Sequence, residues 1–74
     1  MNAIIKFDNK LIRITNYNPS TLIHKLEILL GYELSEYGKS NVNVLHTYDI
    51  SDIDEMLLMD IYEVRYNIKY SILD

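Results

Sequence analysis

The chain has 74 residues, of which eleven are acidic and seven are basic, and its formal net charge at pH 7 is −4. So short a chain is close to the lower size limit for an independent core, and we expect a single domain over residues 1–74. The absence of cysteine excludes disulfides and thiolate metal sites. The acidic excess disfavours nucleic acid as a partner, because binding to a phosphate backbone depends on Lys and Arg.

The composition also bears on location. No apolar run approaches the roughly 20 residues that span a bilayer, and Lys6 and Asp8 interrupt the N-terminal stretch where a secretory signal is continuous. We therefore expect a cytoplasmic protein with no membrane contact. Eleven Ile and seven Asn against two Gly and two Arg indicate an AT-rich genome. A short chain starting at Met1 agrees with a phage or mobile-element origin, which would place the protein in a host cytoplasm.

Residues 3–15 are predicted to form a β-hairpin. Apolar residues alternate along both halves, and Asp8 and Asn9 suit a two-residue turn because both tolerate positive φ. This turn fixes which residues face one another across the pair and puts their apolar side chains on one face. The predicted pairs are Ile5 with Ile12 and Ala3 with Ile14, and the apolar residues left on the opposite face are Ile4 and Leu11.

A long helix is predicted over residues 19–37. Asn18 can cap it and Pro19 suits its first position, where the missing N–H is no loss. Gly38 is placed to end it in the left-handed conformation, whereas Gly31 within it costs about 1 kcal/mol relative to Ala. The apolar stripe at spacings of three and four consists of Ile23, Leu26, Leu30, Leu34 and Tyr37.

Residues 41–48 alternate and predict a third strand, and Ser51 is a candidate N-cap for a short helix over residues 52–60. From Tyr62 to Ile72 every second residue is apolar, which predicts a fourth, half-buried strand. A helix here would place Tyr62 and Val64 on nearly opposite sides and leave apolar surface exposed, so the strand is preferred.

These elements predict an α+β fold in the order ββαβαβ. The expected sheet has four mainly antiparallel strands, with one face covered by the helix over 19–37 and the short helix over 52–60. The other face is expected to be open to solvent and to carry Lys6 and Arg13.

No motif for catalysis is present. The chain has no Gly-rich phosphate loop, no nucleophile elbow and no cofactor motif. Its two histidines, His24 on the polar side of the first helix and His46 at the edge of a core face, do not make a zinc ligand set. We therefore expect no enzyme, catalytic residue, metal site or cofactor.

Two groups of residues are candidates for binding a partner. Carboxylates gather where the short helix begins, a place that the helix dipole favours for negative charge. Glutamates one turn apart near the end of the long helix are flanked by tyrosines, a residue type that often anchors interfaces. The first group is Asp49, Asp52, Asp54 and Glu55, and the second is Tyr32, Glu33, Glu36 and Tyr37.

The expected function is therefore protein binding. A small acidic inhibitor of the anti-defence or anti-CRISPR type would occlude a basic, nucleic-acid-binding site on a host protein. Two alternatives remain open. Tyr62, Tyr66 and Tyr70 on one sheet face could stack with bases in a nucleic-acid-binding module. The long fourth strand could instead pair along its edge with a second copy, which would make the chain a subunit of a homodimer or larger homo-oligomer.

Overall fold

The computed structural model describes residues 1–49 and 55–73, and of residues 70–73 it describes the backbone. The chain has an α+β fold, as predicted. Three strands form an antiparallel sheet in the order β2-β1-β3, and a fourth strand, β4, pairs in parallel with β2 at the far edge. The elements are β1 (Asn2–Phe7), β2 (Lys10–Ile14), α1 (Leu22–Leu30), α2 (Glu36–Ser40), β3 (Asn43–Tyr48), α3 (Glu55–Tyr66) and β4 (Tyr70–Leu73).

The N-terminal hairpin confirms both the predicted turn and the predicted register. Asp8 and Asn9 have φ values of 49° and 59°, the left-handed conformation that a two-residue type I′ turn requires at both central positions. Ile5 lies opposite Ile12, and Ala3 lies opposite Ile14. The turn chemistry and the apolar alternation therefore specify the same pairing.

The single helix predicted over residues 19–37 is wrong, because Gly31 divides it. Its φ of 84° ends α1, with its N–H donating to the Glu27 carbonyl at 2.8 Å. The chain then turns before α2 begins, and Gly38, the predicted terminator, lies inside α2. At the other end Asn18 does not cap α1, which follows Thr21. The side-chain oxygen of Asn18 instead accepts the Ser20 N–H at 3.2 Å, in the turn that precedes the helix.

The strand predicted over residues 62–72 is also wrong over its first half. Residues 55–66 form α3, and Asn67, with a φ of 53°, follows its end. The chain then becomes extended only at β4, which is parallel to β2 rather than antiparallel. The short helix predicted over 52–60 therefore continues further than expected, and its predicted start and the Ser51 cap lie outside the described residues.

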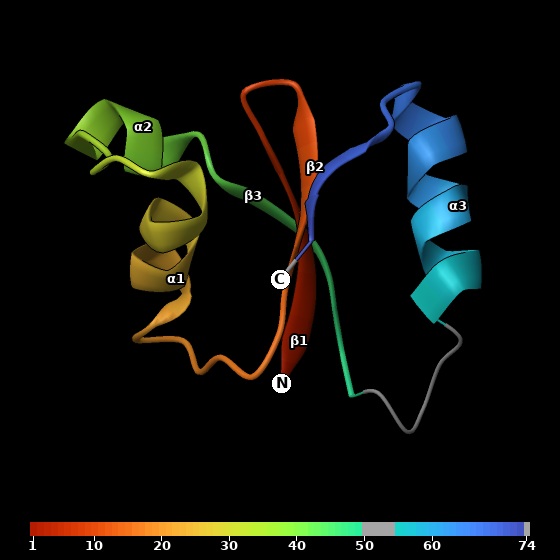
Figure 1. Cartoon of the computed structure of the whole chain (residues 1–74), viewed down its shortest axis with the longest axis horizontal. Helices are drawn as coiled ribbons and strands as arrows, with labels where there is room; N and C mark the ends of the chain where they lie inside the picture. Colours follow the sequence, from red (N-terminus) through yellow and green to blue (C-terminus); the bar gives the residue numbers. More distant parts are fainter. Residues whose placement is uncertain (50–54, 74) are drawn as a thin grey trace.

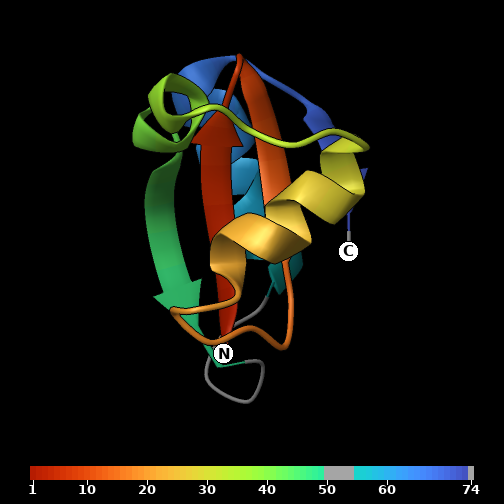
Figure 2. The ribbon, with the colours of Figure 1, turned by 90° about the vertical axis from the view of Figure 1, so that its left-hand side faces the viewer.

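The helices cover both faces of the sheet, so the prediction of one open face is wrong. Figure 1 shows α1 and α2 on one side of the strands and α3 on the other. Figure 2 shows α1 crossing in front of β1 and β2, with α3 behind them. Ile4 and Leu11, on the face predicted to be open, are fully buried beneath α3. A second helix was needed because this face, too, carries apolar residues.

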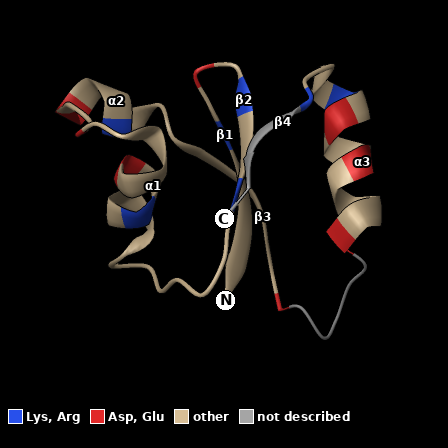
Figure 3. Ribbon diagram, viewed as in Figure 1, with Lys and Arg blue, Asp and Glu red and all other residues tan. Residues whose placement is uncertain are grey.

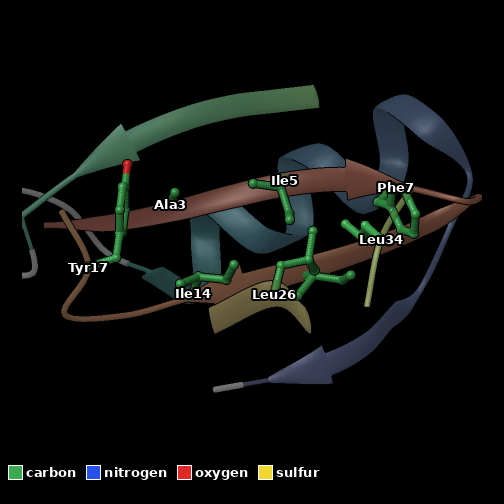
Figure 4. Packing of buried hydrophobic residues seen from close by; sticks show 8 residues of the cluster. Ala3, Ile5, Phe7, Ile14, Tyr17, Leu26 and Leu34 are labelled. Carbon is green, nitrogen blue, oxygen red and sulfur yellow. The ribbon is translucent and has the colours of Figure 1, made fainter. Parts of the chain in front are cut away.

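Each face has a core of its own. The core under α1 is shown in Figure 4, where side chains from β1, β2 and α1 converge. The core under α3 is smaller and includes two tyrosines whose rings are buried but whose hydroxyl groups find acceptors. The first core contains Ala3, Ile5, Phe7, Ile12, Ile14, Tyr17, Leu26 and Leu34, and the second contains Ile4, Leu11, Tyr48, Leu58 and Tyr62.

Candidate protein-binding surfaces

All four residues of the second predicted group are exposed, with Tyr32 and Glu33 between α1 and α2 and with Glu36 and Tyr37 in α2. Tyr32 is 51% exposed and Tyr37 is 79% exposed, and Glu33 and Glu36 between them are exposed as well. We call these four residues the Tyr–Glu surface. It combines large aromatic side chains with carboxylates on one segment of the chain.

Local contacts order the backbone of this segment. Leu34, in its middle, is buried in the core under α1, and its N–H donates to the Glu27 carboxylate at 2.8 Å. The side chain of Ser35 caps α2 by accepting the Gly38 N–H at 3.1 Å. The exposed tyrosines and glutamates thus project from a backbone that is anchored on both sides, which lowers the entropy lost when a partner binds.

The first predicted group is only partly available to a partner. Asp49 is exposed, but Glu55 is not, since its side chain is only 17% exposed and lies against the sheet. Its carboxylate is 3.3 Å from the Arg13 guanidinium and accepts the Tyr48 hydroxyl at 2.7 Å. Glu55 is therefore held by contacts within the chain, and Asp52 and Asp54 lie outside the described residues.

These contacts make Glu55 part of the fold. The carboxylate, at the first residue of α3, joins that helix to β2 through Arg13 and to β3 through Tyr48. Burial, and then the hydrogen bond to Glu55, raise the pKa of the Tyr48 hydroxyl well above its usual range, so that it remains a donor to the carboxylate.

Two of the three tyrosines that could have formed a stacking platform on the sheet, Tyr62 and Tyr66, lie instead on α3, and Tyr70 begins β4. Tyr62 and Tyr66 stack on each other with ring centroids 6.4 Å apart, and the Arg65 guanidinium lies 5.3 Å from the Tyr62 ring. The Tyr62 hydroxyl donates to the Leu45 carbonyl and lies 3.4 Å from Nδ1 of His46. Because Tyr62 is buried, bases cannot stack on it, and the side chain of Tyr70 lies outside the description.

A surface that the sequence analysis missed lies on the outer side of α3. Leu57, Ile61 and Val64 are 60%, 44% and 82% exposed, and their spacing of four and three residues places them in one line along the helix. We call them the outer stripe. Only Val64 was covered by the sequence argument, because the helix that was set aside for leaving apolar side chains exposed began at Tyr62.

Figure 3 shows how charge is distributed around these surfaces. Acidic residues predominate over basic ones on α3, and the Tyr–Glu surface has two carboxylates, one of which, Glu36, lies 3.5 Å from Lys39.

Over residues 1–49 and 55–73, no three side chains of the metal-binding types gather into a possible ion site. Within the same ranges, no helix has the length and apolar character needed to cross a membrane.

Comparisons with known proteins give no relative for this chain. No family model, no curated protein and no solved structure matches it.

Proposed function

We propose that this chain is a small acidic inhibitor that binds a basic site on another protein through the Tyr–Glu surface. The observation that carries the proposal is that Tyr32 and Tyr37 are exposed next to two exposed carboxylates on an anchored segment. Tyrosine is enriched among residues that dominate binding energy, because it offers a large apolar ring and a polar tip. Carboxylates beside it would select a basic partner and speed association.

The composition suggests what kind of partner this is. A net charge of −4 and exposed acids suit competition with nucleic acid for a basic surface. A phage- or mobile-element-encoded protein of the anti-defence type, acting on a host nucleic-acid-binding protein in the cytoplasm, would work in this way. On this proposal the chain catalyses no reaction and uses no cofactor.

The test compares two matched pairs of variants for capture of host proteins from a lysate, identified by mass spectrometry. Tyr37→Ala is matched by Ile28→Ala, which truncates an exposed apolar residue of α1, and Glu33→Lys is matched by Asp49→Lys, with the same change of charge. A basic protein captured by the wild type should be lost about ten-fold or more with Tyr37→Ala and Glu33→Lys, because anchor residues contribute at least 1–2 kcal/mol, and retained with both controls. Equal capture by all four variants would refute the assignment of this surface.

A gel-shift experiment tests the alternative that the chain binds nucleic acid directly. Labelled single-stranded and double-stranded oligonucleotides should not be shifted by the wild type, even at low salt, where electrostatic binding to phosphates is strongest. A shift that Lys6→Glu and Arg65→Glu abolish would contradict the inhibitor proposal and favour direct nucleic-acid binding near α3.

A further inference from the structure

We propose that the outer stripe is the interface of a homodimer in which the α3 helices of two copies pack side by side and parallel. This inference goes beyond the proposed inhibitor function, because it concerns the opposite face of the sheet from the Tyr–Glu surface (Figure 1). Leu57, Ile61 and Val64 recur at the four-and-three spacing of helices that pack along a common seam. The inner side of the same helix already buries Leu58 and Tyr62, so α3 is apolar on two sides.

The size of this surface agrees with an interface. Leu57, Ile61 and Val64 present apolar area on the order of 350 Å², within the range of the largest patch on a typical monomer, which is often functional. Two copies would bury on the order of 700 Å² of apolar surface, which with the bordering charged side chains approaches the lower end of the range for specific complexes. The expected dimer is therefore weak, with a dissociation constant in the micromolar range.

The charges that border the stripe select both the partner and its direction. At 100° per residue, Asp60 lies on one side of the line through Leu57, Ile61 and Val64, and Arg65 lies at a similar angle on the other side. Packed parallel, Asp60 of one copy lies next to the partner's Arg65, and the two-fold axis repeats this opposite-charge pair. Packed antiparallel, the edges carrying Asp60 would face each other. A second copy packed in parallel is thus complementary to the surface.

Sedimentation velocity tests whether the dimer forms. The wild type should sediment as a dimer at about 100 µM and dissociate on dilution to about 1 µM, as a micromolar constant requires. Val64→Asp should remain monomeric throughout, whereas Ile28→Asp, at an exposed apolar residue of α1, should dimerise like the wild type. A wild type that is monomeric at both concentrations, or a dimer indifferent to Val64→Asp, would overturn the proposal and leave the Tyr–Glu surface untouched.

The absence of native cysteine allows direct measurement of the helix direction. In a parallel pair, equivalent seam positions lie close enough for a disulfide, so Leu57→Cys alone and Val64→Cys alone should each cross-link under oxidation. In an antiparallel pair, cross-linking would require mixing these two variants. Cross-links that form only in the mixture would contradict the parallel arrangement. Single variants that cross-link no more than the Ile28→Cys control would contradict it as well.

Charge reversal separates a second copy from a different partner. Asp60→Lys and Arg65→Glu should each weaken self-association about ten-fold, because each places like charges together twice in the dimer. An equimolar mixture of the two variants should restore association, since every pair is then of opposite charge. Circular dichroism must first show that each variant is folded, because Arg65 also contacts the Tyr62 ring. Weakened singles that the mixture does not restore would refute the pairing.

Discussion

Two residues of α3 that are two positions apart distinguish the observed helix from the strand that the alternating pattern predicts. In a strand, Tyr62 and Val64 would point to the same covered face, and truncating either would destabilise the protein. In the helix, Tyr62 is 8% exposed and packs against the sheet, whereas Val64 is 82% exposed. Tyr62→Ala should therefore lower the free energy of unfolding by about 3–5 kcal/mol, as truncation of a buried aromatic ring does.

Val64→Ala should change the free energy of unfolding by less than about 0.5 kcal/mol, because the side chain is exposed and Ala is the better helix former. Tyr62→Phe should cost about 1 kcal/mol, since it removes only the hydroxyl that donates to the Leu45 carbonyl at 3.2 Å. For a chain of this length the total stability is roughly 4–11 kcal/mol, so the loss with Tyr62→Ala is a large part of it.

The assay is urea unfolding followed by circular dichroism, at a protein concentration low enough to keep any dimer dissociated. The test depends on the difference in the free energy of unfolding between the two alanine variants. Their positions are only two residues apart, so any local disturbance of the helix affects both. A Val64→Ala variant that loses as much stability as Tyr62→Ala would refute the helix and restore the strand.

Two further predictions concern the contacts of Glu55. Glu55→Ala should cost about 2–3 kcal/mol, because it leaves the half-buried Arg13 and the Tyr48 hydroxyl without this carboxylate. The double variant with Arg13→Met, measured by urea unfolding, should lose less than the sum of the single losses, and strictly additive losses would contradict a direct interaction. Because burial and Glu55 raise the pKa of Tyr48 in the folded state, stability should be unaffected by this group below pH of about 10 and fall above it, by up to about 1.4 kcal/mol per pH unit, as the unfolded tyrosine ionises. Tyr48→Phe should reduce the loss of stability with rising pH and leave the part that is due to Tyr17, whose pKa burial also raises. An unchanged pH dependence would show that the pKa of Tyr48 is not raised in the folded protein.

The N-terminal hairpin could be predicted in detail because everything that determines it is local. Asp8 and Asn9 tolerate the turn conformation, and a two-residue turn leaves only one register in which the apolar residues of both strands share a face. The division of the long helix could not be predicted with the same certainty. Both glycines were possible terminators, and Leu34 continues the helical spacing although it reaches the core from a loop.

The error in the last third of the chain has a physical cause. A spacing of four residues places Tyr62 and Tyr66 on the same side in a helix and in a strand alike, so the two patterns coincide over a short stretch. The residues that decide between the helix and the strand lie far away in the sequence. Ile4 and Leu11 need a cover on the second face of the sheet, and α3 is the element that supplies it.

The same distinction between local and distant information applies to the candidate sites. On the Tyr–Glu surface, the 79% exposure of Tyr37 contradicts its place on the predicted apolar stripe, whereas the exposure of Glu33 and Glu36 was predictable from local periodicity. The role of Glu55 was not, since Arg13, with which it pairs, lies 42 residues earlier in the chain. A carboxylate at a helix start looks equally suitable for a partner or for a basic residue of the same chain until the sheet is assembled.

The two proposed surfaces do not compete for the same part of the molecule. α1 and α2 lie on one side of the sheet and α3 on the other (Figure 1), so two copies joined through α3 would carry their Tyr–Glu surfaces on the outside, facing away from each other. Such a dimer would present two equivalent binding surfaces, and binding at one would raise the effective concentration of the other near a partner with two sites. If both proposals hold, a weak dimer and a modest interface would together provide an affinity for such a partner that neither would have alone.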